Sequence, residues 1–245
     1  MTRIDEIADR IYRISTHVAA GPPGGITHNQ FLVLGDEPLL FHTGTPRTFA
    51  AVRDAVATVV RPERLRWISS THASRPDEYG SLAEWLAIAP NAQPAHGRVG
   101  CFLCLSDVAA RAPRPLGDGE LLELGGPRVR WLDTPHVPGP WEAGVMFEET
   151  TRTLFCGDLF SRAGAADVVT TGDIVEPAIS HDRRMNGNAV TPATGPTLRR
   201  LAALSPAMLA LMHGPAFRGD GAAPLRALAD HFDARLREAL APPAA

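Results

Sequence analysis

The sequence predicts an α/β protein with a four-layer αββα architecture, in which two β-sheets pack face to face and helices cover both outer faces. Two successive blocks of short apolar strands, each followed by amphipathic helices, indicate this arrangement. No Pro-, Gly- or Ser-rich linker separates the blocks, so we expect a single domain over residues 1–245. The glycines of residues 21–25 lack the fingerprint of a dinucleotide-binding turn, which argues against a doubly wound sheet.

The first block begins with strands and continues with alternating strands and helices. Short apolar runs on either side of Gly35-Asp36-Glu37 are typical of a hairpin. Apolar side chains at helical spacing then indicate helices, and short strands precede the later ones. The expected strands are residues 10–15, 29–34, 38–42, 65–70 and 92–95, and the expected helices are residues 47–60, a segment through Leu82, Trp85 and Leu86, and residues 100–110.

The second block repeats the order of strands before helices. Gly, Pro and charged residues separate its short apolar runs. A long polar stretch without periodicity, residues 162–194, predicts a largely irregular loop that lies over one face and shapes a pocket. The expected strands are residues 120–124, 129–132, 144–147, 153–156 and 207–212, the expected helices are residues 197–204 and 222–240, and the candidate pocket-lining side chains are Trp141, Phe160, His181, Met185 and Phe217.

Composition and charge exclude several classes of function. The formal net charge is -3, which argues against a nucleic-acid partner, since duplex binding needs a clustered basic surface. The chain contains no Lys, which excludes Schiff-base chemistry on a lysine. Residues 1–13 carry charges where a signal peptide is apolar, and no run is long enough for a membrane span. With three Cys and no disulfide framework, we expect a cytoplasmic protein without a membrane partner.

Four short polar segments, each directly after an apolar strand, carry the candidate chemistry. Loops that follow the strands of a layered α/β domain converge on one edge of the sheets. Imidazole and carboxylate groups gathered there suit zinc, iron or manganese. The candidate metal ligands in these segments are His72, Asp77, His136, Asp158 and His213.

The other histidines and the cysteines have more ordinary explanations. His28 and His181 lie where they could face the site, and we treat them as weaker candidates for contacts to it. His17, His42, His96 and His231 show no matching spacing. Cys101 and Cys104 form a CxxC pair, but they lie in an apolar helical run without a second pair, so we interpret them as core thiols.

The motifs and their order resemble the metallo-β-lactamase superfamily, and most closely its flavodiiron or oxygen-binding di-iron branch. The matching segments are NQFLVLGDEPLLFHTG, ISSTHASRPDEYGSLAEWLAIAPNA, WLDTPHVPGPWEAGVMFEETTRTLFCGDLF and LALMHGPAFRGDG. The resemblance implies the metallo-β-lactamase fold and two metal positions bridged by Asp158. The first position would be held by His72 and His136, and the second by Asp77 and His213, with Glu78 as a further ligand.

The sequence departs from the family pattern at the first metal position. Hydrolytic members carry HxHxDH and di-iron members carry HxExD, whereas this chain has Ala73, Ser74 and Arg75 between His72 and Pro76. One residue is inserted, and the second ligand of the motif is missing. The first metal position would then retain only His72, His136 and Asp158.

Three hypotheses for function remain open at this point. The leading one, implied by the resemblance and by the carboxylate-rich ligand set, is a non-haem iron protein with two irons that binds or reduces dioxygen or a similar small diatomic. The sequence contains no flavodoxin-like module, so electrons would come from an external donor. One alternative is a zinc-dependent hydrolase that acts on an ester, thioester, lactone or phosphodiester. The other is a degenerate site with a non-catalytic binding role. No individual catalytic residue is assigned, and a homodimer is compatible with the resemblance.

Overall fold

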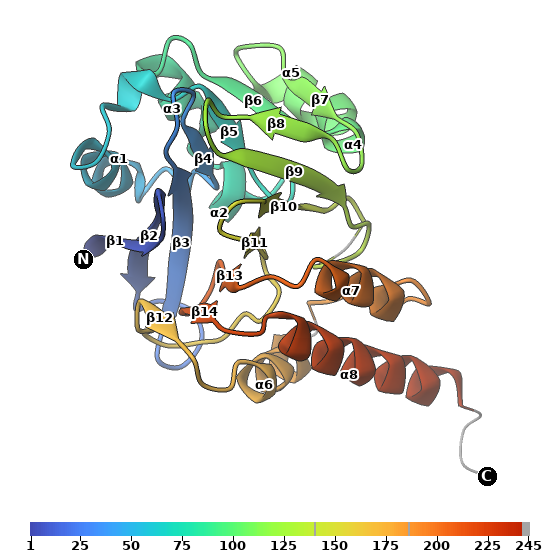
Figure 1. Ribbon diagram of the computed structural model, residues 1–245. Coiled ribbons are helices and arrows are strands. Elements are labelled where there is room, and N and C mark those ends of the chain that lie inside the picture. Colours follow the sequence, from blue (N-terminus) through green and yellow to red (C-terminus); the bar gives the residue numbers. More distant parts are fainter. Residues whose placement is uncertain (140, 186, 242–245) are drawn as a thin grey trace.

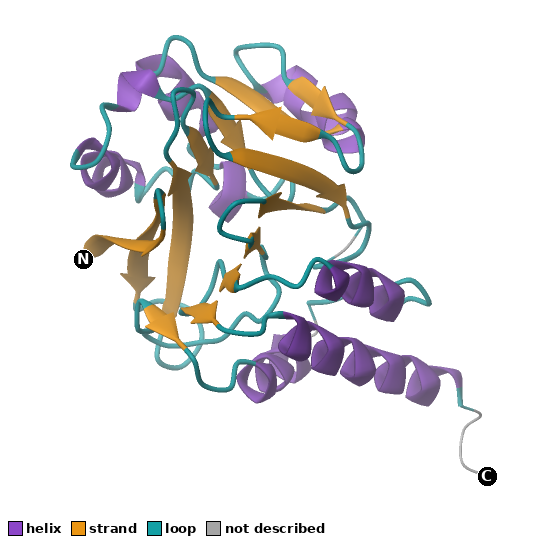
Figure 2. Cartoon of the chain, in the orientation of Figure 1, coloured by secondary structure: helices purple, strands orange, loops and turns teal. Residues whose placement is uncertain are grey.

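The computed structural model describes residues 1–139, 141–185 and 187–241. In this part of the chain, two seven-stranded sheets pack against each other, and helices lie on the outer face of each (Figure 1). This arrangement confirms the predicted αββα architecture. Figure 2 shows that α1 and α3 cover one side of the sandwich, while α6, α7 and α8 cover the other.

The first sheet contains its strands in chain order, from β1 to β7. Neighbouring strands run antiparallel from β1 to β4 and parallel from β4 to β7. The helices α1 (Phe49–Ala57) and α3 (Leu82–Ile88) connect its later strands. Its strands are β1 (Thr2–Ala8), β2 (Ile11–Val18), β3 (Ile26–Val33), β4 (Leu39–Phe41), β5 (Trp67–Ser69), β6 (Gln93–Gly97) and β7 (Arg114–Leu116).

The second sheet has the order β12-β14-β13-β11-β10-β9-β8. Its pairs are antiparallel except β11 with β13 and β12 with β14. Its strands are β8 (Leu121–Glu123), β9 (Arg128–Asp133), β10 (Gly144–Glu148), β11 (Thr153–Phe155), β12 (Val169–Thr170), β13 (Met208–Ala210) and β14 (Ala216–Arg218), and its helices are α6 (Val175–Met185), α7 (Thr194–Ala203) and α8 (Ala222–Leu240).

Short helical segments complete the chain. A continuous helical stretch follows β6 and contains one π-helical turn at its centre. These segments are η1 (Pro62–Arg64), α2 (Pro76–Tyr79), α4 (Arg98–Gly100), η2 (Cys101–Leu105) and α5 (Ser106–Val108). Within the described residues, no helix combines the length and the apolarity that crossing a bilayer requires.

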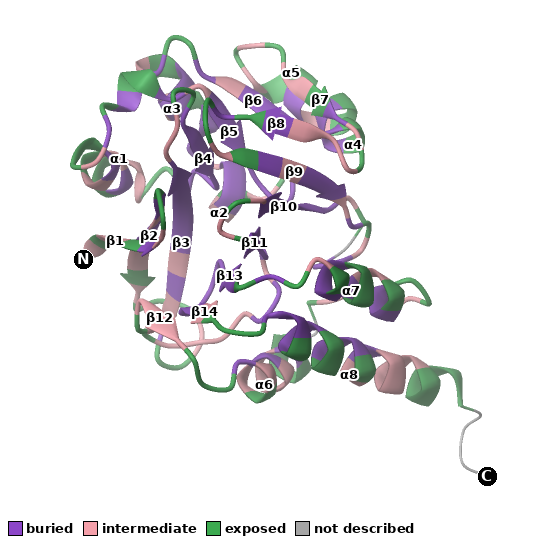
Figure 3. Cartoon of the chain, viewed as in Figure 1, coloured by how far each residue is buried: buried purple, intermediate pink, exposed green. Residues whose placement is uncertain are grey.

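Apolar side chains fill the space between the sheets and the two spaces under the helices. Between the sheets, Phe155 packs against Phe31 and Phe41 with ring centroids 5.6 and 5.3 Å apart. The central strands β4, β5, β10, β11 and β13 are buried on both faces, whereas the outer strands and the helices keep exposed positions (Figure 3). Burial of apolar area on this scale is the main free-energy term that holds the layers together.

The expectation for residues 162–194 was wrong in part. The structure places β12 and the three-turn helix α6 inside this stretch. The helix was not predicted because it is largely polar, although Val175, Ala178 and Ile179 pack against the core at helical spacing. The edge strand β1 and the short strand β7 were also not predicted, because an edge or a three-residue strand needs few apolar positions.

The topology gathers loop segments at one rim of the sandwich. Four of these loops begin at the ends of β5, β9, β11 and β13. The third residue after each of these strand ends is, in the same order, His72, His136, Asp158 and His213. The predicted placement of polar segments after strands is therefore confirmed, and the side-chain directions decide which of them meet.

Candidate metal centre

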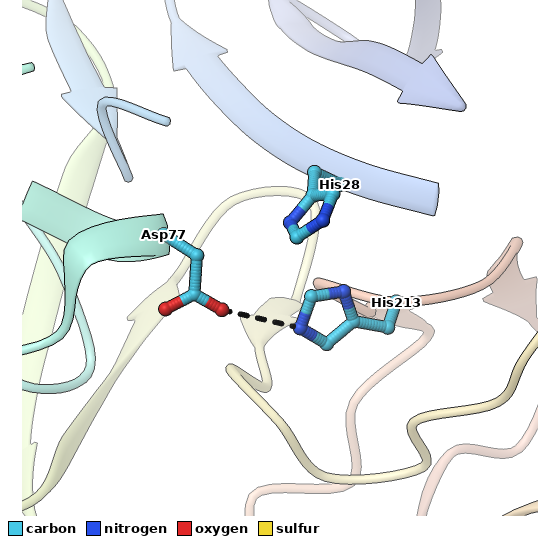
Figure 4. Close-up of side chains that lie close together, drawn as sticks. All are labelled: His28, Asp77 and His213. Atoms are coloured by element: carbon cyan, nitrogen blue, oxygen red, sulfur yellow. Dashed lines mark ion pairs between the residues drawn. The ribbon is translucent and has the colours of Figure 1, made fainter. Parts of the chain in front are cut away.

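His28, Asp77 and His213 bring three ligand atoms within 4.8 Å of one another (Figure 4). They come from three separate elements: strand β3, the first turn of α2, and the loop after β13. Asp158, from the loop after β11, joins them, since its Oδ1 lies 3.1 Å from His213 Nε2. Asp77 Oδ2 lies 3.7 Å from the same nitrogen. Two imidazoles and one carboxylate therefore form a compact group at the rim, and the carboxylate of Asp158 adjoins it through His213.

Strand β3 holds the His213 loop in place. Asn29 Nδ2 donates hydrogen bonds to the carbonyls of Leu211 and Gly214, at 2.7 and 2.8 Å. The His213 ring donates from Nδ1 to the carbonyl of Thr27 at 2.9 Å. Because Nδ1 is committed to a carbonyl, Nε2 is the atom that faces the carboxylates, which is the usual way to orient a histidine ligand.

The cluster carries strongly shifted pKa values. Burial alone would lower the pKa of His213, but hydrogen bonds with Asp158 and Asp77 raise it to about 10. Burial would raise the pKa of Asp158, yet the hydrogen bond from His213 and the charges of His213 and Arg75 lower it to about 2. The same neighbours outweigh burial at Asp77 and lower its pKa. Without a metal, His213 is thus an imidazolium between two carboxylates.

Arg75 lies inside the carboxylate cluster. Its Nη2 is 3.2 Å from Asp158 Oδ2, and its Nε is 3.5 Å from Asp77 Oδ1 and 3.4 Å from Glu78 Oε1. The guanidinium therefore neutralises carboxylates at a point where two metal ions would otherwise meet. A fixed positive charge at this distance opposes the binding of a second cation.

His72 and Glu78 form a pair of their own behind this cluster. Glu78, which is fully buried, accepts hydrogen bonds from the His72 backbone and from His72 Nδ1, both at 2.6 Å. His72 Nε2 donates to the carbonyl of Pro138 at 2.9 Å. Burial opposes the charge, but Glu78 raises the pKa of His72 to about 9. Both ring nitrogens of His72 therefore have hydrogen-bond partners within the protein, Glu78 and the Pro138 carbonyl.

His136 does not join the cluster. Its φ of 65° is in the left-handed region, and its Nδ1 accepts a hydrogen bond from the Trp141 backbone at 2.9 Å. Among the described residues, the metal-compatible group contains His28, Asp77 and His213, and His136 is not a member. The structure therefore brings Asp77, Asp158 and His213 together and leaves His72, Glu78 and His136 outside.

A family model described as ODP family beta lactamase matches residues 26–214. The chain belongs to the ODP family of β-lactamase-fold proteins. The predicted family resemblance and fold are thereby confirmed, and the structural relatives of this ODP-family chain include flavodiiron proteins.

Three relatives illustrate the similarity. Diflavin flavoprotein A 3 of Nostoc sp. is 26% identical over 203 residues, which cover 80% of this chain and 34% of that protein. Rubredoxin oxygen:oxidoreductase from Desulfovibrio gigas superposes with a TM-score of 0.82 at 17% identity, covering 94% of this chain and 62% of that one. Fragment 1–254 of diflavin flavoprotein A 5 from Nostoc superposes with a TM-score of 0.81 at 18% identity, covering 97% of this chain and 98% of that one. This ODP-family chain thus spans about a third of the curated relative's length.

The donor set of this ODP-family chain fits one cation better than two. His28 Nδ1 is a buried atom without a hydrogen-bond partner, as expected for an atom that awaits a ligand, whereas Asp158 Oδ1 lies 3.1 Å from His213 Nε2. At the remaining position expected from the family, Arg75 pairs with Asp158, and both ring nitrogens of His72 have hydrogen-bond partners. His28 was predicted only as a weaker candidate for a contact to the site, since nothing in the sequence around it distinguishes a metal ligand from an ordinary strand residue.

The cluster opens into a cavity of about 200 Å³. Helix α6 contributes His181, Asp182 and Met185 to its wall, so the stretch expected to shape the pocket does so through a helix. Phe160 lines a smaller adjoining hollow, Trp141 lines a second cavity, and Phe217 packs against the core under α6–α8. The wall beside the ligands is polar on the side of Asp182 and Asn188 and apolar at Ile26 and Met185.

Proposed function

We propose that this chain is a non-haem metal protein that holds one cation, iron in the leading case, and binds or reduces dioxygen or a similar small diatomic. Asp77, Asp158 and His213 would hold the cation, with His28 as the fourth donor. The observation that carries the proposal is the convergence of His28, Asp77 and His213 from three separate segments within 4.8 Å of one another, with Asp158 Oδ1 3.1 Å from His213 Nε2. The sequence led us to expect two irons. We propose one instead, because Arg75 and the His72 imidazolium occupy the other metal position expected from the family.

The ligand chemistry favours iron or manganese over zinc. Two carboxylates and two imidazoles are harder and more anionic than the imidazole-rich set of a hydrolytic zinc site. Once His213 has lost its Nε2 proton, the two carboxylates exceed the guanidinium of Arg75 by one negative charge, which leaves a field that attracts a single divalent ion. Iron would supply the binding of a small diatomic and the exchange of electrons with it.

The residues around the donors have defined tasks in this proposal. Arg75 offers a positive charge to an anionic or polarised ligand beside the cation. Loss of the Nε2 proton from His213 frees its lone pair, so metal binding should release a proton. The small cavity, partly walled by His181 and Met185, restricts the ligand to a few atoms. Electrons would come from a separate redox partner.

Metal analysis of the protein reconstituted anaerobically with ferrous iron tests the proposal. We expect about one iron per chain in the wild type and less than a tenth of that in Asp158→Asn and His213→Ala, because loss of a ligand typically reduces affinity by orders of magnitude. His136→Ala is the matched control and should retain wild-type iron. Dioxygen consumption with an artificial reductant should follow iron content. Two irons per chain, with one lost in His136→Ala, would contradict the proposal, and selective zinc retention with esterase activity would favour hydrolysis instead.

A further inference from the structure

A second cavity, of about 360 Å³, lies on the other side of Arg75 from the metal site. Arg75 lines both cavities, so its side chain is the wall between them. The second cavity also includes Ser74, Leu103, Cys104, Trp141 and Glu142. None of these residues belongs to the proposed ligand set, and the proposed chemistry gives the cavity no task.

One side of this cavity is apolar and open. Trp141 is 60% exposed and Leu103 is 45% exposed, whereas Trp67, Trp85 and Trp131 are buried in the core. Cys104, expected in the core, is half-buried and lines the same cavity. An exposed indole beside aliphatic and thiol groups offers a flat apolar surface, which suits a planar ring.

Three charged side chains also line the cavity, His72, Arg75 and Glu142, and both ring nitrogens of His72 are already engaged by Glu78 and the Pro138 carbonyl. Glu142 is already engaged, since it contacts His96 Nε2 at 2.8 Å and accepts a hydrogen bond from the Ala73 backbone at 3.0 Å. Burial also raises the pKa of Glu142. Arg75 forms ion pairs of 3.2–3.5 Å with Asp77, Glu78 and Asp158, but its buried Nε makes no hydrogen bond. The available recognition group is therefore a guanidinium.

We propose that the second cavity binds a small organic carboxylate with a planar apolar body. Its carboxylate would pair with the Arg75 guanidinium, whose planar fork matches a carboxylate in bidentate geometry. Its ring would lie on Trp141 and Leu103. The volume of about 360 Å³ accommodates a ligand the size of a substituted benzoate.

Binding in this cavity should also change the affinity of the metal site, an inference that rests on the proposed function. A carboxylate in the second cavity competes with Asp77 and Asp158 for the same guanidinium. Drawing Arg75 away leaves those two carboxylates less neutralised and thus raises their affinity for a cation. By thermodynamic reciprocity, the cation must raise the affinity for the organic carboxylate by the same factor.

Calorimetric titration of the metal-free protein with benzoate tests the cavity without reference to any metal. We expect saturable binding at one site, at least about tenfold tighter than that of neutral benzamide at equal ionic strength. Arg75→Gln should abolish it, Arg75→Lys should retain part of it, and Trp141→Ala should weaken it at least fivefold or so. Arg61→Gln, at an exposed arginine outside both cavities, is the matched control. Circular dichroism confirms that each variant is folded.

Two outcomes of this titration would overturn the cavity proposal. Tighter binding of the cation benzamidine than of benzoate would mean that Glu142, and not Arg75, is the recognition group. Benzoate binding by Arg75→Gln with wild-type affinity would place the site elsewhere.

The coupling is tested by titrating Mn²⁺ in the presence and absence of saturating benzoate, with chloride as the matching anion. We expect benzoate to tighten Mn²⁺ binding by about fivefold or more in the wild type and to have no effect in Arg75→Gln. Benzoate binding without any change in Mn²⁺ affinity would refute the coupling and leave the proposed function intact. Failure of Mn²⁺ and Fe²⁺ to bind under either condition would count against the proposed function. The benzoate titration of the metal-free protein would still test whether the second cavity binds a carboxylate.

Discussion

At the scale of single residues, the charges around Arg75 determine what the rim of the sandwich can bind. Three carboxylates, Asp77, Glu78 and Asp158, lie within 3.5 Å of its guanidinium. Glu78 is also neutralised by His72, so Arg75 mainly offsets the other two. Such a network leaves room for one cation and for an anion beside it, and each charge in it can be tested by substitution.

Arg75→Ala should increase the affinity for a divalent cation. Removing the guanidinium leaves Asp77 and Asp158 unneutralised, which we expect to tighten Mn²⁺ or Fe²⁺ binding by roughly tenfold. Competition with a fluorescent chelator measures this. Arg61→Ala, at an exposed position, serves as the control. Weaker metal binding in Arg75→Ala would show that the guanidinium organises the carboxylates instead of opposing the cation.

His72→Gln should remove a pH-dependent part of the stability. The pKa of His72 is raised to about 9, so its pairing with Glu78 stabilises the fold fully below the unfolded pKa near 6.5. That stabilisation is lost as pH rises through about 9. We expect the difference in unfolding free energy between wild type and variant to fall by about 2 kcal/mol between pH 6.5 and pH 10.

Urea denaturation of the metal-free proteins across this pH range measures that difference. His17→Gln, at an exposed histidine, should show no such trend. A constant difference from pH 6.5 to pH 10 would mean that His72 is neutral in the folded protein.

Gly157→Ala should disturb the loop that presents Asp158. Gly157 has a φ of 54°, and a Cβ there would lie 2.3 Å from Thr71 Oγ1. The collision moves either Thr71 or the neighbouring Asp158, and we expect destabilisation by about 1–3 kcal/mol together with weaker metal binding. Thermal unfolding and metal titration test this. Gly172→Ala is a suitable control, because its nearest neighbour atom is 3.4 Å away and its φ is not positive.

At the scale of secondary-structure elements, α6 depends on one buried carboxylate for its position over the cavity. Asp182 pairs with Arg235 of α8 and accepts a hydrogen bond from Asn188 Nδ2 at 2.8 Å. Asn188 Oδ1 in turn accepts from the Gly139 backbone at 3.1 Å. This chain of contacts joins α6 to the loop whose Pro138 carbonyl receives the His72 ring. The wall of the cavity is thus connected to the polar network behind it.

Asp182→Ala should loosen α6 without unfolding the sandwich. The helix is largely polar and has few buried side chains, so this one anchor carries much of its attachment. We expect hydrogen exchange of the α6 amides to accelerate by about tenfold or more, as a lost buried hydrogen-bonded charge pair implies. Mass spectrometry after deuterium labelling measures this. Asp107→Ala, at an exposed position in α5, is the control and should leave the exchange of the α6 amides unchanged. Unchanged exchange in Asp182→Ala as well would mean that apolar contacts alone hold the helix.

Sequence predicted the elements with strong apolar periodicity better than those with little. The core strands and α8 have many buried apolar positions and were predicted, whereas α6 was not, because polar residues outnumber the few apolar side chains, Val175, Ala178 and Ile179, that face the core. The positions of Asp77, Asp158 and His213 followed from strand ends. The direction of His136 did not, because it depends on a left-handed backbone at that residue and a hydrogen bond from Trp141.

At the scale of the whole molecule, the two sheets act as a rigid frame that delivers loops to one rim. His28 comes from the first sheet, and Asp158 and His213 come from loops of the second, so the site exists only when both halves are packed together. A cation that binds the folded state alone should therefore stabilise the entire fold. At a free concentration one hundred times its dissociation constant, the expected gain is about 2.7 kcal/mol.

Anomalous diffraction at the iron edge, from a crystal reconstituted anaerobically with ferrous iron, is the most direct test of the central claim. One peak is expected, at roughly 2.0–2.2 Å from ligand atoms of Asp77, Asp158 and His213, with Arg75 beside it and His72 still paired with Glu78. Two peaks, one of them coordinated by His72 and His136, or no peak at this rim, would contradict the account.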